Sequence, residues 1–132
     1  MEGDRIEDEE VVYLRVPPMA HWFEPPDHVT TANFKLDDRR GDLGLSVYRQ
    51  SNVTVEQVLA KADAIPESRV ASATVGEIRR LKNRAKKPEP LNLDVIVVDD
   101  ENDPGHAEIR GPTPGTLAPA ASKALRDLFK LV

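Results

Sequence analysis

The alternation of apolar and polar residues along the chain predicts several short strands. Residues 11–16 (VVYLRV) are rich in β-branched side chains, which favour a strand. Residues 30–36 alternate, and residues 43–48 place Leu43, Leu45 and Val47 on one face, so these two segments predict a hairpin. Further strands are predicted at the segments RVASAT (69–74), LNLDVIVV (91–98) and AEI (107–109). The continuous apolar end of residues 91–98 predicts a strand that is buried on both faces.

Three segments have the signals of helices. The sequences Thr54-Val-Glu-Gln57 and Thr74-Val-Gly-Glu77 are capping boxes, which predict a helix over residues 55–64 and a shorter helix after Thr74. Pro119 suits the first turn of a helix. The apolar stripe of the last predicted helix contains Leu125, Leu128, Phe129 and Val132.

Together these elements predict an α+β fold: a single small domain with a mainly antiparallel or mixed sheet and two or three helices. We expect an acidic disordered tail at residues 1–10, because six of these ten residues are acidic. The α+β domain is expected to cover residues 11–110. A Pro/Gly-rich loop follows at 111–119, and a C-terminal amphipathic helix at 120–132.

Composition excludes several classes of site. The 132 residues are enough for one domain with a real core. The chain has no cysteine, so a disulfide scaffold, a thiolate zinc site and a cysteine nucleophile are excluded. No apolar run is long enough to cross a bilayer, and the acidic start is unlike a signal peptide, so we expect a cytoplasmic protein that is not bound to a membrane.

One cluster of acids and histidines suggests a metal or catalytic site. The predicted strand 91–98 ends in DDENDPGH, and carboxylates with imidazole suit metal ions. The Asn-Asp-Pro-Gly sequence equally predicts a solvated turn. The candidate metal ligands are His21, His28, Asp99, Asp100 and His106. Their spacing matches no known motif, and we expect no bound cofactor.

A basic stretch follows the second capping box. Six cations occur within nine residues: Arg79, Arg80, Lys82, Arg84, Lys86 and Lys87. They suit phosphate groups, but no aromatic residue interleaves with them and the net charge of the chain is −5, which argues against nucleic acid. The stretch is expected to be a solvated helix end, to dock an acidic partner, or to fold back on the acidic tail.

Two apolar features suit a protein partner. The proline-flanked loop PPMAHWFEPP presents aromatic side chains, which are common anchors at interfaces. The terminal helix either closes the core or presents its stripe to another chain. The candidate partner-binding residues are Met19, Trp22, Phe23, Leu125 and Phe129.

Three segments carry a resemblance: TTANFKLDDRRGDLGLSVYR, VASATVGEIRRL and DPGHAEIRGP. In this order they resemble small uncharacterised bacterial proteins that are loosely associated with accessory genes of bacterial conflict systems. The resemblance emphasises Arg15, Phe34, Ser46, Val47 and His106, and implies no known chemistry. Arg15 on a first strand and Glu108 on a last strand also resemble the layout of ADP-ribosyltransferase folds, whose distinctive middle motif is missing.

These observations lead us to expect a non-enzymatic cytoplasmic module that binds another protein or a second copy of the chain. The alternative is a small metal-binding protein or enzyme that uses His106 with Asp99 and Asp100. Serine catalysis is not expected, because Ser46 lies within a predicted strand and lacks the glycine that follows the serine of a nucleophile elbow.

Overall fold

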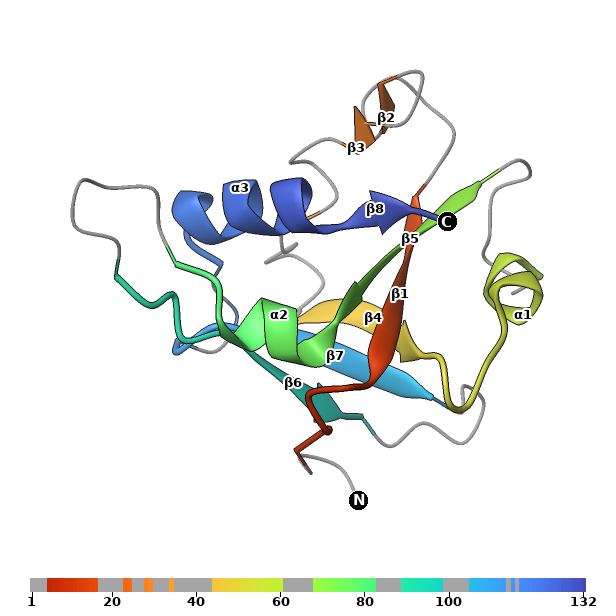
Figure 1. Ribbon diagram of the computed structural model, residues 1–132, viewed down its shortest axis with the longest axis horizontal. Coiled ribbons are helices and arrows are strands. Elements are labelled where there is room, and N and C mark those ends of the chain that lie inside the picture. The colour runs from red at the N-terminus through yellow and green to blue at the C-terminus, as the bar shows by residue number, and fades with distance from the viewer. Residues whose placement is uncertain are drawn as a thin grey trace.

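The computed structural model describes residues 5–16, 23–24, 28–29, 34, 44–60, 68–82, 89–98, 105–113, 115 and 117–132. The elements in chain order are β1 (Val11–Val16), β2 (Phe23–Glu24), β3 (His28–Val29), β4 (Leu45–Arg49), α1 (Val55–Leu59), β5 (Arg69–Thr74), α2 (Val75–Arg79), β6 (Asp94–Val97), β7 (His106–Arg110), α3 (Pro119–Leu128) and β8 (Lys130–Leu131). Figure 1 shows one sheet with helices packed around it, and the small β2–β3 pair beside β8, which β3 contacts. The predicted α+β fold is confirmed.

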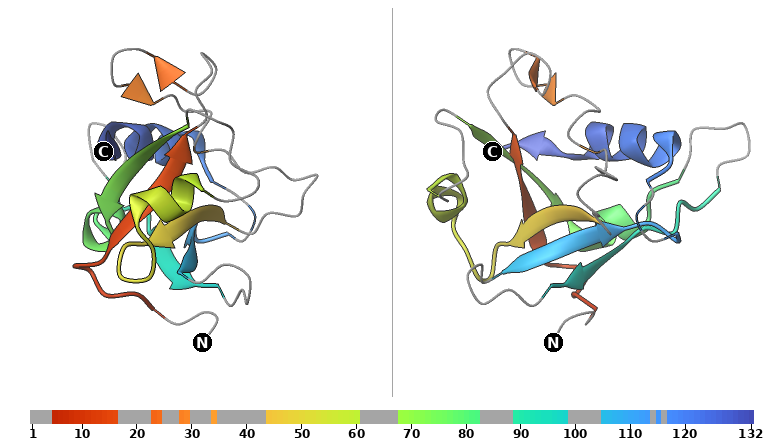
Figure 2. Two further views of the ribbon diagram at one scale, coloured as in Figure 1. Left: turned by 90° about the vertical axis from the view of Figure 1, so that its right-hand side faces the viewer. Right: turned by 180° about the vertical axis from the view of Figure 1, so that it is seen from behind.

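The main sheet is antiparallel and has the order β6-β7-β4-β1-β5-β8. Strand β1 pairs along its whole length with β5, whereas its pairing with β4 is confined to Val12↔Arg49 and Tyr13↔Tyr48. The sheet therefore consists of two leaves that meet at a short junction: β1, β5 and β8 form the first leaf, and β4, β6 and β7 the second. The two leaves cross at a steep angle (Figure 2).

The main core fills the angle between the leaves. Val12, Leu14 and Val16 alternate along β1 and face the same cluster as Leu45 and Val47 of β4. Helix α3 covers this cluster with Leu125 and Phe129, and the ring of Phe129 packs on that of Phe34 at a centroid distance of 5.4 Å. Leu45 and Val47, which the sequence predicted to share one face of the strand 43–48, thus lie on the core face.

A smaller cluster lies on the outer face of the junction. Tyr13 and Tyr48, which are cross-strand partners, pack there with Val58 of α1. Helix α1 contacts β1 and β5 and lies at one end of the molecule, away from α2 (Figures 1 and 2). Both faces of the sheet junction are therefore covered by apolar side chains.

Both predicted capping boxes are present. The Thr54 hydroxyl accepts from the Gln57 amide N–H while the Gln57 side chain accepts from the Thr54 N–H, and Thr74 and Glu77 repeat this arrangement. Pro119 occupies the first turn of α3, as predicted.

Several predicted boundaries are wrong. Residues 5–10 are packed on the domain, because Ile6 belongs to the main core. Helix α3 ends at Leu128, and the chain then pairs with β5 as β8, so the terminal helix does not reach residue 132. Among the described strands the neighbours of β4 are β1 and β7. The hairpin predicted with residues 30–36 lies outside the described residues, apart from Phe34.

The apolar run 91–98 is not buried on both faces. It forms the edge strand β6, where Leu93 and Val95 enter the core while Ile96, Val97 and Val98 are half-buried. An edge strand needs protection of its free side. The protection comes from the other end of the chain, as Arg5 forms an antiparallel bridge with Ile96.

Candidate functional site

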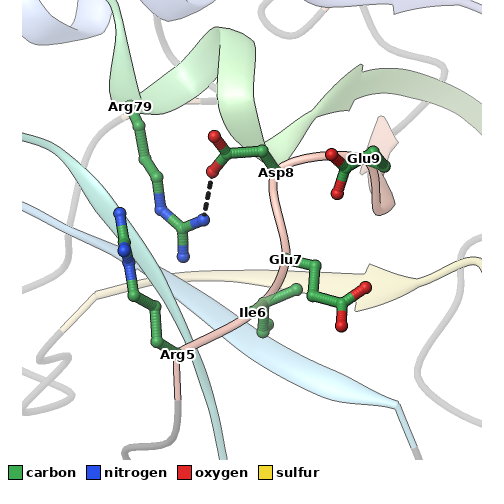
Figure 3. A pocket seen from close by; sticks show the side chains of 6 residues that line it. All are labelled: Arg5, Ile6, Glu7, Asp8, Glu9 and Arg79. Atoms are coloured by element: carbon green, nitrogen blue, oxygen red, sulfur yellow. Dashed lines mark hydrogen bonds and ion pairs between the residues drawn. The ribbon is translucent and has the colours of Figure 1, made fainter.

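The described residues enclose a cleft between the start of the chain and α2. We call residues 5–10 the N-terminal segment. The cleft has a volume of about 330 Å³ and is open to solvent. Its lining residues are Arg5, Ile6, Glu7, Asp8, Glu9 and Arg79 (Figure 3). Five of these six residues belong to the N-terminal segment, and Arg79 is the contribution of α2.

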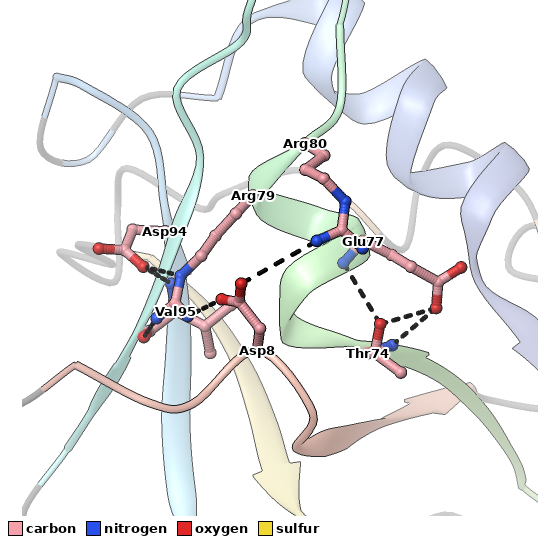
Figure 4. A network of polar contacts seen from close by, with 7 residues as sticks. All are labelled: Asp8, Thr74, Glu77, Arg79, Arg80, Asp94 and Val95. Atoms are coloured by element: carbon pink, nitrogen blue, oxygen red, sulfur yellow. Dashed lines mark hydrogen bonds and ion pairs between the residues drawn. The ribbon is translucent and has the colours of Figure 1, made fainter.

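Arg79, the last residue of α2, anchors the cleft through three contacts. Its Nη1 donates to Asp8 Oδ1 at 2.6 Å, and its Nε donates to Asp94 Oδ1 at 2.7 Å. Its Nη2 donates to the backbone oxygen of Val95 at 3.4 Å. The side chain is 9% exposed, and Figure 4 shows it between the N-terminal segment and β6. A guanidinium suits this position because its fixed fork of donors reaches several acceptors at once.

The electrostatics of the cleft are those of an ion pair. The hydrogen bond from Arg79 lowers the pKa of Asp8 below its usual value of 3.8. Asp8 is therefore ionised at neutral pH, and a guanidinium stays protonated throughout the physiological range. Both groups are charged when they face each other across the cleft.

Backbone contacts hold the N-terminal segment along α2. The N–H of Gly76 donates to the carbonyl of Asp8, and the N–H of Val75 donates to the carbonyl of Glu10, both at 2.9 Å. Glu10 N–H also donates to the carbonyl of Glu7 at 3.1 Å, so the segment turns after Ile6. A Cβ on Gly76 would lie 3.0 Å from Asp8 Cβ and 3.1 Å from its oxygen. Glycine at this position therefore permits the close approach.

A second polar group lies on the outer face of the second leaf. His106 Nε2 lies 3.1 Å from the Ser46 hydroxyl, and the imidazole stacks on the Tyr48 ring at 5.9 Å. Next to them, Arg110 donates from both Nε and Nη2 to one carboxylate oxygen of Glu108. These side chains share a face because they alternate along the paired strands β4 and β7.

Gly44 makes room for the Arg110 side chain. A Cβ at Gly44 would lie 2.7 Å from Arg110 Cγ and 2.7 Å from the Ile109 oxygen. The pair of Arg110 with Glu108 therefore depends on a glycine beside β4. The resemblance emphasised Ser46 and His106, which are in contact, and also Phe34 and Val47, which are core residues. Arg15 and Glu108 lie on β1 and β7, with β4 between them in the sheet.

Two of the residues expected to bind a partner are core residues instead. Leu125 is fully buried and Phe129 is 2% exposed, because α3 closes the main core. Met19 and Trp22 lie outside the described residues. Phe23 pairs with Val29 in the small β2–β3 sheet, and its side chain is likewise outside the described part.

The expected metal ligands are described in part. His106 lies on β7, whereas His21, Asp99 and Asp100 fall outside the described residues. His28 forms part of β3, without a described side chain. Within the described ranges, no three histidine or carboxylate side chains are grouped so that they could hold a metal ion.

The described residues of the basic stretch differ in exposure: Arg79 is largely buried, whereas Arg80 and Lys82 are exposed. Arg79 folds back on the acidic start of the chain, which confirms one of the predicted alternatives. Arg80 is 68% exposed and its Nη1 lies 4.0 Å from Asp8 Oδ2, while Lys82 is exposed. Arg84, Lys86 and Lys87 are not among the described residues.

Sequence reasoning missed Ile6, Gly76 and Asp94 as site residues. A signal for Ile6 exists, because it is the one large apolar residue after Met1 in a strongly acidic stretch. Gly76 lies inside a capping box, where a glycine lowers helix propensity and so indicates a close contact. Asp94 has no such signal, because its contact with Arg79 depends on the tertiary fold.

No family model matches this chain, and no curated protein or solved structure is significantly similar to it. Among the described residues, no helix has the length and apolar character to cross a membrane.

Proposed function

We propose that this protein is a non-catalytic interaction module of the bacterial cytoplasm, which binds an acidic segment of another protein at the Arg79 cleft. The observation that carries the proposal is that the fold holds its own acidic segment against Arg79, β6 and the start of α2. This surface supplies a place in the core for Ile6, a guanidinium for the Asp8 carboxylate, and backbone amides for two carbonyls.

The same contacts suit a segment from another chain. Main-chain pairing to a strand edge gives affinity, and side-chain positions along the edge give specificity. Strand β6 offers such an edge, and Arg79 adds selection for a carboxylate. The exposed cations Arg80 and Lys82 lie close by in sequence and would steer an acidic partner toward the cleft.

Site-specific photo-crosslinking in bacterial cells tests the proposal. A photoreactive amino acid replaces Arg80, beside the cleft, and in a matched variant it replaces Glu56, which is exposed on α1 at the far end of the molecule. We expect the probe at position 80 to capture a protein through a segment rich in Asp and Glu. The probe at position 56 should not capture that segment.

The identity of the crosslinked segment decides the outcome. Arg79→Met added to the position 80 probe should abolish capture if the guanidinium selects the carboxylate. Crosslinks of equal yield from positions 80 and 56, or crosslinks to segments without acids, would contradict binding at the cleft. The resemblance to proteins of bacterial conflict systems directs the search first to products of neighbouring genes.

A second candidate function is a small enzyme that uses the outer face of the second leaf. The observation in its favour is the contact of His106 Nε2 with the Ser46 hydroxyl, since a nucleophile beside a base is the minimum for covalent catalysis. A fluorophosphonate probe should then label Ser46 and fail to label His106→Ala. Equal labelling of Ser46 and of the exposed Ser51 would show ordinary surface reactivity.

A further inference from the structure

We infer that the N-terminal segment is a resident competitor at the Arg79 cleft, and that a partner binds by displacing it. This inference rests on the proposed function, because it states how the same cleft is regulated. It also defines the ligand: an acidic segment with an aliphatic residue two positions before an aspartate, as Ile6 precedes Asp8.

Glu10, at the end of the N-terminal segment, is held by Arg49 and Ser51 and stays in place. The rest of the segment has few anchors, so it can leave without unfolding the domain. Ile6 is its one buried side chain, at 3% exposure, whereas Arg5, Glu7, Asp8 and Glu9 are exposed. The Asp8 side chain remains 51% exposed despite its ion pair. Local opening is drawn from regions of this kind, which have few buried contacts.

The receptor side of the cleft belongs to the folded domain. Arg79 keeps its bond to Asp94 when Asp8 leaves, and therefore remains positioned. Val95 N–H donates to the Asp94 carboxylate at 2.8 Å, which ties the same acid to β6. The amides of Val75 and Gly76 are fixed at the start of α2, whose capping box does not involve the N-terminal segment. An incoming segment would thus meet a prepared site.

Displacement also frees the edge of β6. The Arg5↔Ile96 bridge occupies that edge while the segment is bound. A partner that continues as a strand beyond its own aliphatic residue can take over this pairing. A tethered competitor has an effective concentration of the order of millimolar, so a partner must offer more contacts than the resident segment.

A peptide of residues 1–10, MEGDRIEDEE, tests the inference with the full chain. The peptide carries a fluorophore, and its binding is followed by anisotropy against the wild type, Ile6→Ala and Asp8→Asn. Both substitutions weaken the resident segment and leave the receptor residues intact. Glu56→Gln is the charge-matched control, because Glu56 is exposed on α1 and does not line the cleft.

We expect Ile6→Ala to bind the peptide on the order of tenfold more tightly than the wild type, because the apparent Kd falls as the open fraction rises. Asp8→Asn should show a smaller gain, and Glu56→Gln should match the wild type. A control peptide of equal composition, in which the residues corresponding to Ile6 and Asp8 exchange places, should not bind. Near-UV circular dichroism confirms that each variant remains folded.

The possible failures are distinguishable. Equal affinity for the wild type and both weakened variants would overturn the resident competitor and leave peptide binding at the cleft intact. Absence of binding to folded Asp8→Asn and folded Ile6→Ala would overturn the proposed cleft as well. If sedimentation shows that the wild-type chain dimerises, the inference that the ligand is a different protein would be overturned. The cleft would then be assigned to a second copy of the chain.

Discussion

Arg79 joins three parts of the chain that are distant in sequence. Its guanidinium contacts Asp8 of the N-terminal segment, Asp94 of β6 and the backbone oxygen of Val95 (Figure 4). Arg80, its neighbour, has one long contact and is mostly exposed. Two adjacent arginines of the basic stretch therefore have different roles, and burial distinguishes them.

Replacing Arg79 should destabilise the domain, whereas replacing Arg80 should not. Arg79→Met removes hydrogen bonds to charged partners, and we expect the free energy of unfolding to fall by about 1–2 kcal/mol. Arg80→Met should change it by less than about 0.5 kcal/mol, as is usual at exposed positions. Urea denaturation measures both. Equal effects of the two substitutions would contradict the contacts assigned to Arg79.

The Asp8–Arg79 pair should make stability depend on pH in the acid range. Because the folded state lowers the pKa of Asp8 below 3.8, the pair contributes stability above that value and loses it as pH falls through the lowered pKa. The difference in Tm between the wild type and Asp8→Asn should therefore be full at neutral pH and vanish in strong acid. A difference that is constant with pH would show that the carboxylate charge is not involved.

At the scale of elements, α2 is built to accept the N-terminal segment. Alanine normally stabilises a helix by about 1 kcal/mol relative to glycine. At Gly76 the added Cβ would press on Asp8, so we expect Gly76→Ala to lower the free energy of unfolding by about 1 kcal/mol instead.

A double-mutant cycle with Ile6→Ala checks this reason. Once the segment is released, Gly76→Ala should become neutral or stabilising. If the cost of Gly76→Ala stays the same in both backgrounds, the close approach of the segment is not its cause.

Local signals predicted most elements because their causes are local. The β-branched runs gave β1 and β5 with the observed bounds, and both capping boxes occur where Thr54 and Thr74 predict them. The failure at β6 is instructive. The apolar run 91–98 predicted a strand that is buried on both faces, whereas β6 is an edge strand. Its edge is covered by the N-terminal segment, and Arg79 binds the backbone of Val95; the N-terminal segment lies far from β6 in the sequence.

At the scale of the whole molecule, α3 covers the side of the main core that the two parts of the sheet do not cover. Its stripe was equally consistent with an interface, and sequence could not decide between these alternatives because they require the same periodicity. Burial of Leu125 and the contact of Phe129 with Phe34 decide in favour of the core. The Ser122 hydroxyl adds a buried hydrogen bond to the Phe34 carbonyl at 2.8 Å.

Alanine substitutions of Phe129 and Val132 should therefore differ in their effect on the free energy of unfolding. Phe129→Ala should cost about 3–5 kcal/mol, as is typical of a large core side chain. Val132→Ala should cost less than about 0.5 kcal/mol, since Val132 is 62% exposed. Thermal denaturation compares the two. A small effect of Phe129→Ala would contradict a core role for this side chain and would favour partner binding by the α3 region.

The candidate site was less predictable than the fold. One predicted alternative was that the basic stretch folds back on the acidic tail. This alternative is correct for the two segments, but the sequence did not identify Asp8 and Arg79 as the interacting pair, since they are 71 residues apart. The tail was expected to be disordered because its composition is acidic, and the single apolar residue Ile6 reverses that expectation for residues 5–10 by entering the core. Contacts of this range depend on the topology of the sheet.

Under the proposed displacement, the N-terminal segment is held at the cleft separately from the rest of the fold. Hydrogen exchange followed by NMR measures this directly. The amides of Val75 and Gly76, which donate to the segment, should exchange much faster than those of Val12 and Leu14 in β1, and faster still in about 0.5 M NaCl, which screens the ion pair. Equal protection of all four amides, unchanged by salt, would show that the segment opens only when the whole domain unfolds. This result would contradict displacement of the N-terminal segment from the folded domain.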